Sequence, residues 1–180
     1  MLRLTMQINT PVDLSEPPAA FPAVLVVSDT QRQFAQGSSR PSGDPSAPAS
    51  GDAPRVLLVD DNEMTLARGK SVLATRCVVV GTARNGHAAL EAAAALNPDV
   101  IVLDISMPGM NGFELAKRLR AAGSTARLVF LSVHEDEELI LAARNAGGIG
   151  YVVKTRLASD LELAVKEARA GRPFQSPVRW

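Results

Sequence analysis

The amino-acid sequence predicts an α/β protein in which helices cover both faces of a parallel sheet. Two observations support this prediction. Short apolar runs recur at regular intervals after Pro54, and amphipathic stretches of helical length separate them. Runs that are apolar at every position are typical of strands buried on both faces of a parallel sheet. The stretches between them provide the crossover connections that parallel strands require, which favours a three-layer α/β fold.

Five runs rich in β-branched residues and leucine are the predicted strands: residues 56–59, 78–80, 100–103, 128–131 and 151–153. Apolar residues at helical spacing mark the five predicted helices: Leu66, Val72 and Leu73; Ala88, Ala89 and residues 92–96; Phe113, Leu115, Ala116 and Leu119; residues 139–143; and Leu161, Leu163, Val165 and Ala168. The second of these helices should stop before Pro98, since the residue that precedes a proline avoids helical geometry.

The predicted helix ends agree with these positions of the strands and helices. Two segments resemble capping boxes, in which a side chain at the helix start and one three residues later each bond a free backbone N–H. They are Asn111 with Glu114, and Ser159 with Glu162. Glycines stand where three of the helices should end, namely Gly123, Gly147 and Gly171.

Composition divides the chain into a folded domain and two flanking segments. Eight of the twelve prolines lie within the first 54 residues, and residues 36–54 are mostly Ser, Pro, Gly and Ala. Such a segment buries too little to offset the entropy of ordering, so residues 1–54 are predicted to be disordered or loosely attached. Residues 55–171 form the predicted domain. Residues 172–180 carry two prolines and are expected to be a tail.

Charge and cysteine content narrow the functional classes. Nineteen basic residues balance nineteen acidic ones, so no net field attracts the chain to nucleic acid or to an anionic membrane. Cys77, the single cysteine, excludes an intramolecular disulfide, suits a reducing compartment and is expected to be a buried thiol at a strand entry. No apolar stretch approaches the ~18 residues of a membrane span. We therefore expect a cytoplasmic protein.

Polar residues follow the predicted strands where each one ends. Asp60 and Asp61 follow the first strand, Asp104 the third, Ser132 the fourth and Lys154 the fifth. Asp and Ser often cap the helix after a strand, so any one of them alone carries little weight. Ligands of open parallel sheets gather beyond the carboxyl ends of the strands, so the whole set predicts a site.

The chemistry of this set points to a metal and a phosphoryl group. Three neighbouring carboxylates repel one another, and a divalent cation such as Mg²⁺ relieves the repulsion with hard oxygen ligands. Such a site can also bring a phosphoryl donor beside a carboxylate nucleophile. The metal and Lys154 would then neutralise charge on the transferred oxygens.

The motifs VLLVDDN at 56–62, VLDISMPGMNG at 102–112, LSVH at 131–134 and GYVVK at 150–154 are, in order and spacing, similar to those of response regulator receiver domains from bacterial two-component systems. The resemblance covers residues 55–171. It implies a flavodoxin-like fold of five βα units with the strand order 2-1-3-4-5. It also implies a signalling switch that accepts a phosphoryl group from a sensor histidine kinase and assists its own phosphorylation and dephosphorylation, without being an enzyme.

The resemblance assigns roles to the site residues. Asp104 would be the phosphoacceptor. Asp60, Asp61 and the backbone carbonyl of Ser106 would hold Mg²⁺ together with Asp104, and Lys154 would pair with the phosphoryl oxygens.

Two further residues resemble the family's switch pair. Ser132, in place of the more frequent threonine, would hydrogen-bond the phosphoryl group. Tyr151 would turn inward as Ser132 moves, although an exposed strand tyrosine with a solvated hydroxyl is the alternative. Thr155 stands where many receivers have a proline, so a trans Lys154–Thr155 bond is expected, because a non-proline cis bond costs ~2.5–4 kcal/mol.

The tail leaves several functions open. Residues 170–177 resemble the linker to a helix-turn-helix domain in regulators of the NarL class, but no recognition helix follows. The chain is therefore either a free-standing receiver, with a possible homodimer surface, or the receiver part of a transcriptional regulator; in neither case should this chain bind DNA itself. An aspartate-based phosphohydrolase needs a second aspartate where Ser106 stands. A receiver that works without phosphorylation would not need the complete acidic set.

Removal of the N-terminal segment should leave the domain's stability unchanged, because residues 1–54 offer little surface to bury. A chain beginning at Asp52 should melt within experimental error of the full chain in a thermal unfolding measurement. A loss of several degrees would contradict this prediction and would indicate that the apolar residues 24–27 pack against the domain.

Overall fold

A computed structural model of the chain describes residues 53–177, so the expectations for residues 1–52 and 178–180 lie outside the described residues. One parallel sheet organises the described part, with the order β2-β1-β3-β4-β5-β6. Its strands are β1 (Arg55–Val59), β2 (Val78–Ala83), β3 (Val100–Asp104), β4 (Arg127–Ser132), β5 (Gly148–Val153) and β6 (Phe174–Gln175). The predicted strand order 2-1-3-4-5 is confirmed, and a sixth strand extends it.

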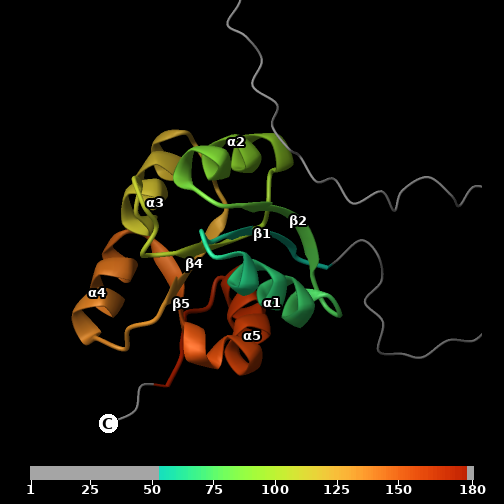
Figure 1. Cartoon of the computed structure of the whole chain (residues 1–180), viewed down its shortest axis with the longest axis vertical. Coiled ribbons are helices and arrows are strands. Elements are labelled where there is room, and N and C mark those ends of the chain that lie inside the picture. The colour runs from blue at the N-terminus through green and yellow to red at the C-terminus, as the bar shows by residue number, and fades with distance from the viewer. Residues whose placement is uncertain (1–52, 178–180) are drawn as a thin grey trace, which may run out of the picture. The chain divides into compact units, whose positions relative to one another are not determined.

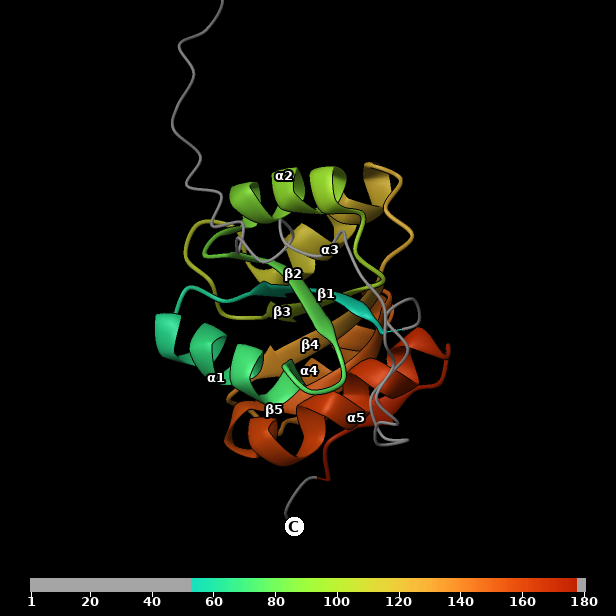
Figure 2. The same ribbon diagram turned by 90° about the vertical axis from the view of Figure 1, so that its right-hand side faces the viewer.

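Helices cover both faces of the sheet, as predicted (Figures 1 and 2). They are α1 (Glu63–Leu73), α2 (Gly86–Leu96), α3 (Gly112–Ala121), α4 (Glu137–Asn145) and α5 (Leu157–Arg169), the last preceded by a short 3₁₀ turn, Lys154–Arg156. Buried residues of α1 and α5 form one apolar cluster with one side of the strands, and those of α2, α3 and α4 form a second cluster on the other side.

The central strands are buried as their apolar sequences predict. Every residue of β3 is buried, and Phe130 on β4 is the largest fully buried side chain. The edge strand β2 differs, because it has a neighbour on one side only: Val78 is exposed and most of the strand is half-buried. Cys77, just before β2, is half-buried against the core, and burial raises the pKa of its thiol to about 11.

The helix ends confirm most of the predicted caps. The Asn111 side chain accepts a hydrogen bond from the Glu114 backbone N–H at the start of α3, which is one half of the predicted capping box; the Glu114 carboxylate instead accepts from Arg118. Gly123, Gly147 and Gly171 take positive φ angles after α3, α4 and α5. The capping box predicted at Ser159 is wrong, because α5 already begins at Leu157 and Ser159 lies inside its first turn. The described residues contain no cis peptide bond, so the Lys154–Thr155 bond is trans, as expected.

The tail contains structure that the sequence did not predict. Phe174 and Gln175 form β6, which pairs in parallel with Gly150 and Tyr151 of β5. The Ser176 backbone N–H donates to the Tyr151 carbonyl at 2.9 Å, which continues the pairing by one bond. Residues 174–176 of the tail therefore pair with β5 along the edge of the sheet.

Among the described residues, no helix has the length and apolar character that crossing a membrane requires.

Candidate functional site

The predicted site residues lie at the carboxyl ends of four neighbouring strands. Asp60 and Asp61 follow the last residue of β1, and Asp104 is the last residue of β3. Ser132 is the last residue of β4, and Lys154 follows β5 directly. These strands are adjacent and parallel, so their ends meet at one edge of the sheet.

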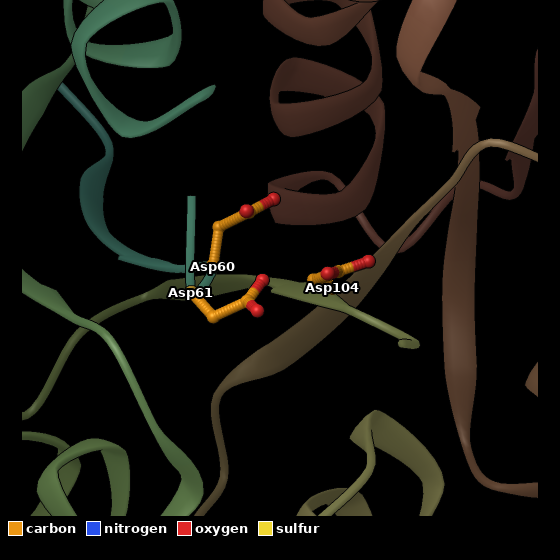
Figure 3. Close-up of side chains that lie close together, drawn as sticks. All are labelled: Asp60, Asp61 and Asp104. Atoms are coloured by element: carbon orange, nitrogen blue, oxygen red, sulfur yellow. The ribbon is translucent and has the colours of Figure 1, made fainter. Parts of the chain in front are cut away.

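The three carboxylates gather there as predicted (Figure 3). One oxygen from each of Asp60, Asp61 and Asp104 can be chosen so that all three lie within 4.8 Å of one another. Asp60 and Asp104 are only 1% and 2% exposed, whereas Asp61 is half-buried and lies nearer to solvent. The cluster is therefore a small acidic pocket with a single partly open side chain.

Lys154 bridges two of these carboxylates. Its Nζ lies 2.8 Å from Asp60 Oδ2 and 3.0 Å from Asp104 Oδ2. Lys154 thus connects the end of β5 to the ends of β1 and β3. Its charge balances one of the three negative charges of the cluster.

The remaining imbalance changes the acidity of these groups. Burial raises the pKa of the Asp60 carboxyl, and the neighbouring Asp104 adds to this, although Lys154 and the Asn62 N–H oppose it. Burial alone would lower the pKa of Lys154, but its contacts with Asp60 and Asp104 outweigh that effect and raise it. Both shifts favour bound protons, as expected where carboxylates outnumber cations. A divalent cation would compete with these protons.

The two oxygens of Asp60 have different partners. Its Oδ1 accepts a hydrogen bond from Asn62 N at 2.9 Å. Its buried Oδ2 has no partner by hydrogen-bond geometry but forms an ion pair with Lys154 Nζ at 2.8 Å. This ion pair offsets part of the cost of burying the carboxylate, and a bound cation would add to that compensation. An all-oxygen donor set also fits Mg²⁺.

The loop after Asp104 holds this residue in place. Asp104 Oδ1 accepts a hydrogen bond from Ser106 N at 3.2 Å. Met107 and Met110 are buried, which anchors the loop against the core. A Cβ added to Gly112 would collide with the Asp104 carbonyl oxygen, so only glycine allows α3 to begin this close to β3.

Ser132 and Tyr151 are connected through the β4–α4 loop. Ser132 Oγ accepts a hydrogen bond from His134 N at 3.0 Å, and the Tyr151 hydroxyl donates to the His134 carbonyl at 2.9 Å. Tyr151 is 3% exposed, so the alternative of an exposed strand tyrosine is wrong. Burial raises the pKa of its phenol, which therefore stays protonated. The His134 side chain is exposed, as a loop histidine should be.

A cavity of about 660 Å³ lies away from this cluster. It is lined by residues at the opposite edge of the sheet, including Asn97, Asp99 and Arg127 near the starts of β3 and β4. None of the predicted site residues lines it. The acidic cluster at the carboxyl ends offers carboxylate oxygens and the Lys154 ammonium, which suit an ion and a phosphoryl group better than a large organic ligand.

Two contacts at the site have no counterpart in the sequence pattern. The backbone carbonyl of His134 accepts the Tyr151 hydroxyl, and no side-chain pattern reveals a backbone acceptor. Asn62 both donates its N–H to Asp60 and caps α1 with its side chain. An asparagine after a strand is a recognisable cap signal, but its bond to Asp60 depends on the turn geometry.

Comparisons with known proteins identify the family to which this domain is similar. The model of the response regulator receiver domain family matches residues 56–166, more than half of the chain. The nitrate/nitrite response regulator protein NarL of Escherichia coli (strain K12) is 40% identical over 118 residues, which cover 64% of this chain and 55% of that protein. The transcriptional regulatory protein LiaR of Bacillus subtilis (strain 168) is 32% identical over 121 residues, 66% of this chain and 57% of that protein.

A solved structure shows the same fold. The signal receiver domain of the response regulator NarL from Mycobacterium tuberculosis superposes with a TM-score of 0.61 and 32% identity, covering 67% of this chain and 98% of that one. The chain spans about half the length of the two curated relatives above. Together with the receiver topology, these matches show that the chain belongs to the response regulators of two-component systems and carries a receiver domain of the NarL type.

Proposed function

We propose that this chain is a phosphorylation-dependent signalling switch in which Asp104 accepts the phosphoryl group. The observation that carries the proposal is the position of Asp104, 2% exposed at the end of β3, in contact with Lys154 and close to Asp60 and Asp61. A carboxylate in this setting is oriented by its neighbours and faces groups that can neutralise incoming negative charge.

The proposed reaction is transfer from a phosphohistidine of a sensor histidine kinase. A carboxylate oxygen of Asp104 attacks phosphorus, and a new P–O bond forms. The P–N bond to the kinase histidine breaks, and its electron pair leaves with the imidazole nitrogen. The Ser106 N–H orients one oxygen of Asp104 before transfer, and Lys154 is near enough to pair with the phosphoryl oxygens afterwards.

Asp60, Asp61, Asp104 and the Ser106 backbone carbonyl would hold a Mg²⁺ ion. When bound, this ion supplies positive charge to the phosphoryl oxygens and offsets the repulsion among the carboxylates. The three carboxylates, each with an oxygen within 4.8 Å of the others, support this assignment from the protein side.

Ser132 and Tyr151 are the proposed switch residues. Ser132 Oγ, which now accepts the His134 N–H, would turn to donate to a phosphoryl oxygen. That movement would displace the β4–α4 loop, and the Tyr151 hydroxyl is bonded to the same loop. The phosphoryl group would thus be sensed at β5 through two hydrogen bonds that meet at His134.

A second candidate is the receiver part of a DNA-binding transcriptional regulator. LiaR is a transcriptional regulator, and this chain spans about half its length. A further domain attached to the tail would then supply the output. Both candidates use the same receiver chemistry. In both, the protein would act in the cytoplasm and could form a homodimer.

Phosphorylation should be specific to Asp104. Incubation with acetyl phosphate and Mg²⁺ should add one labile phosphoryl group, measured by intact mass. Asp104→Asn should abolish the adduct, because an amide is not a carboxylate nucleophile. Glu91→Gln, which changes an exposed acid on α2, is the matched control and should label normally. An adduct that persists in Asp104→Asn would refute the assignment.

Loss of Asp61 should weaken Mg²⁺ binding without unfolding the domain. Asp61→Ala removes the half-buried ligand, so affinity should fall by roughly 10-fold or more, measured by calorimetric titration. Labelling by acetyl phosphate should slow in parallel. The melting temperature without metal should stay or rise, because one of three repelling carboxylates is gone. Unchanged Mg²⁺ affinity would place the ion elsewhere.

This chain alone should show no sequence-specific DNA binding. Specific recognition needs phosphate contacts together with side chains on base edges. The five helices of the described part pack on a sheet, and none is a free recognition element. Titration of labelled promoter DNA at moderate salt, with and without phosphodonor, should show only weak binding that a scrambled competitor removes. Saturable binding that survives this competitor would contradict the prediction.

A further inference from the structure

The tail is fixed to the domain by a buried serine. Ser176 is 0% exposed. Its hydroxyl donates to Asp160 Oδ2 at 2.6 Å and accepts a hydrogen bond from Val153 N at 3.2 Å. When a buried hydroxyl both donates and accepts a hydrogen bond, the two bonds restrict the position of its backbone. Ser176 therefore holds β6 at a defined place on the domain.

The segment that receives Ser176 also carries Lys154. Val153 is the last residue of β5, Lys154 follows it, and Asp160 lies in the first turn of α5. Within this segment Arg156 Nε donates to Asp160 Oδ2 at 2.9 Å, which fixes α5 to the 3₁₀ turn. A displacement of Lys154 would thus change the distances between Ser176 and its two partners.

A second connection joins the tail to the switch residues. Ser176 N donates to the Tyr151 carbonyl, and Gln175 pairs with Tyr151. The hydroxyl of the same tyrosine bonds the His134 carbonyl. The β6 strand therefore contacts both routes that lead from Asp104, one through Lys154 and one through Tyr151.

We propose that Ser176 is a latch that holds residues 172–177 on the domain and that phosphorylation of Asp104 releases it. This inference rests on the proposed function. A phosphoryl group on Asp104 adds negative charge beside Lys154 and draws it away from Asp60. The short contacts of Ser176 fit the arrangement without that group, and buried hydrogen bonds weaken steeply when their geometry changes. Residues 172–177 then gain freedom.

The coupling must be reciprocal. If phosphorylation weakens the latch, opening the latch must favour phosphorylation by the same factor. A variant that cannot form the latch should therefore bind a phosphoryl analogue more tightly. This consequence separates a coupled latch from a strand that only stabilises the fold.

Amide hydrogen exchange of the full chain tests the release. With Mg²⁺ and BeF₃⁻ as the phosphoryl analogue, the Ser176 amide should exchange roughly 5- to 150-fold faster, the range of typical coupling between sites. Amides of β3 should keep their protection. Asp104→Asn should show no change on addition of the analogue.

Two variants test the reciprocal effect against a matched control. Ser176→Ala should lower the BeF₃⁻ concentration needed for half-saturation several-fold, measured by calorimetric titration in the presence of Mg²⁺. Ser71→Ala removes an exposed hydroxyl on α1, outside the latch and the phosphorylation site, and it should leave this concentration unchanged. If Ser176→Ala unfolds, Arg144→Ala serves instead, since Arg144 is exposed and bonds the Gln175 side chain of β6 at 2.8 Å.

The outcomes separate the two proposals. Failure of BeF₃⁻ and Mg²⁺ to bind would overturn the proposed function and the latch together. Binding that leaves the Ser176 amide equally or better protected would overturn the latch alone. Equal affinities in the wild type and in the folded latch variants would also overturn it.

Discussion

The ion pairs of Lys154 with Asp60 and Asp104 are the interaction on which the rest of the site depends. Three carboxylates at the ends of two neighbouring strands repel one another, and burial removes the water that would screen them. Lys154 balances one charge and leaves the others. Burial is the main cause of the raised pKa of Asp60, with a smaller contribution from Asp104, whereas the contacts with Asp60 and Asp104 raise the pKa of Lys154 against the effect of its burial. This residual imbalance gives the pocket its demand for further positive charge and makes it responsive to a change at Asp104.

Much of this arrangement could be predicted from the sequence because it is a consequence of topology. In a parallel sheet, residues that follow adjacent strands must meet at one edge, so Asp60, Asp104 and Lys154 could be brought together without coordinates. The 2.8 Å contact of Lys154 Nζ with Asp60 Oδ2 could not be predicted, because it depends on the conformation of the lysine side chain. The bond from Tyr151 to a backbone carbonyl depends likewise on the path of the β4–α4 loop.

The predictions that failed concern places where short-range patterns compete with tertiary contacts. Ser159 and Glu162 have the spacing of a capping box, but a 3₁₀ turn before α5 moves the helix start to Leu157. The Ser159 hydroxyl then bonds its neighbour Asp160. The β6 strand has only two residues, which gives no alternation to detect, and tertiary contacts stabilise it: its pairing with β5 and the hydrogen bonds of the adjacent Ser176. A segment with the composition of a linker thus became part of the sheet.

The place of β6 in the sheet bears on how a receiver domain can influence the chain beyond its last helix. Strand β5 contributes Lys154 beyond its end and Tyr151 in its middle, and β6 pairs with this strand and no other in the described sheet. A typical coupling of about 1–3 kcal/mol between two sites is comparable to the worth of one or two buried hydrogen bonds. The free energy of the two bonds from Ser176 to Val153 and Asp160 is therefore comparable to a typical coupling free energy. A change at Asp104 need not rearrange the core to alter the tail, since it has only to displace the residues to which Ser176 is bonded.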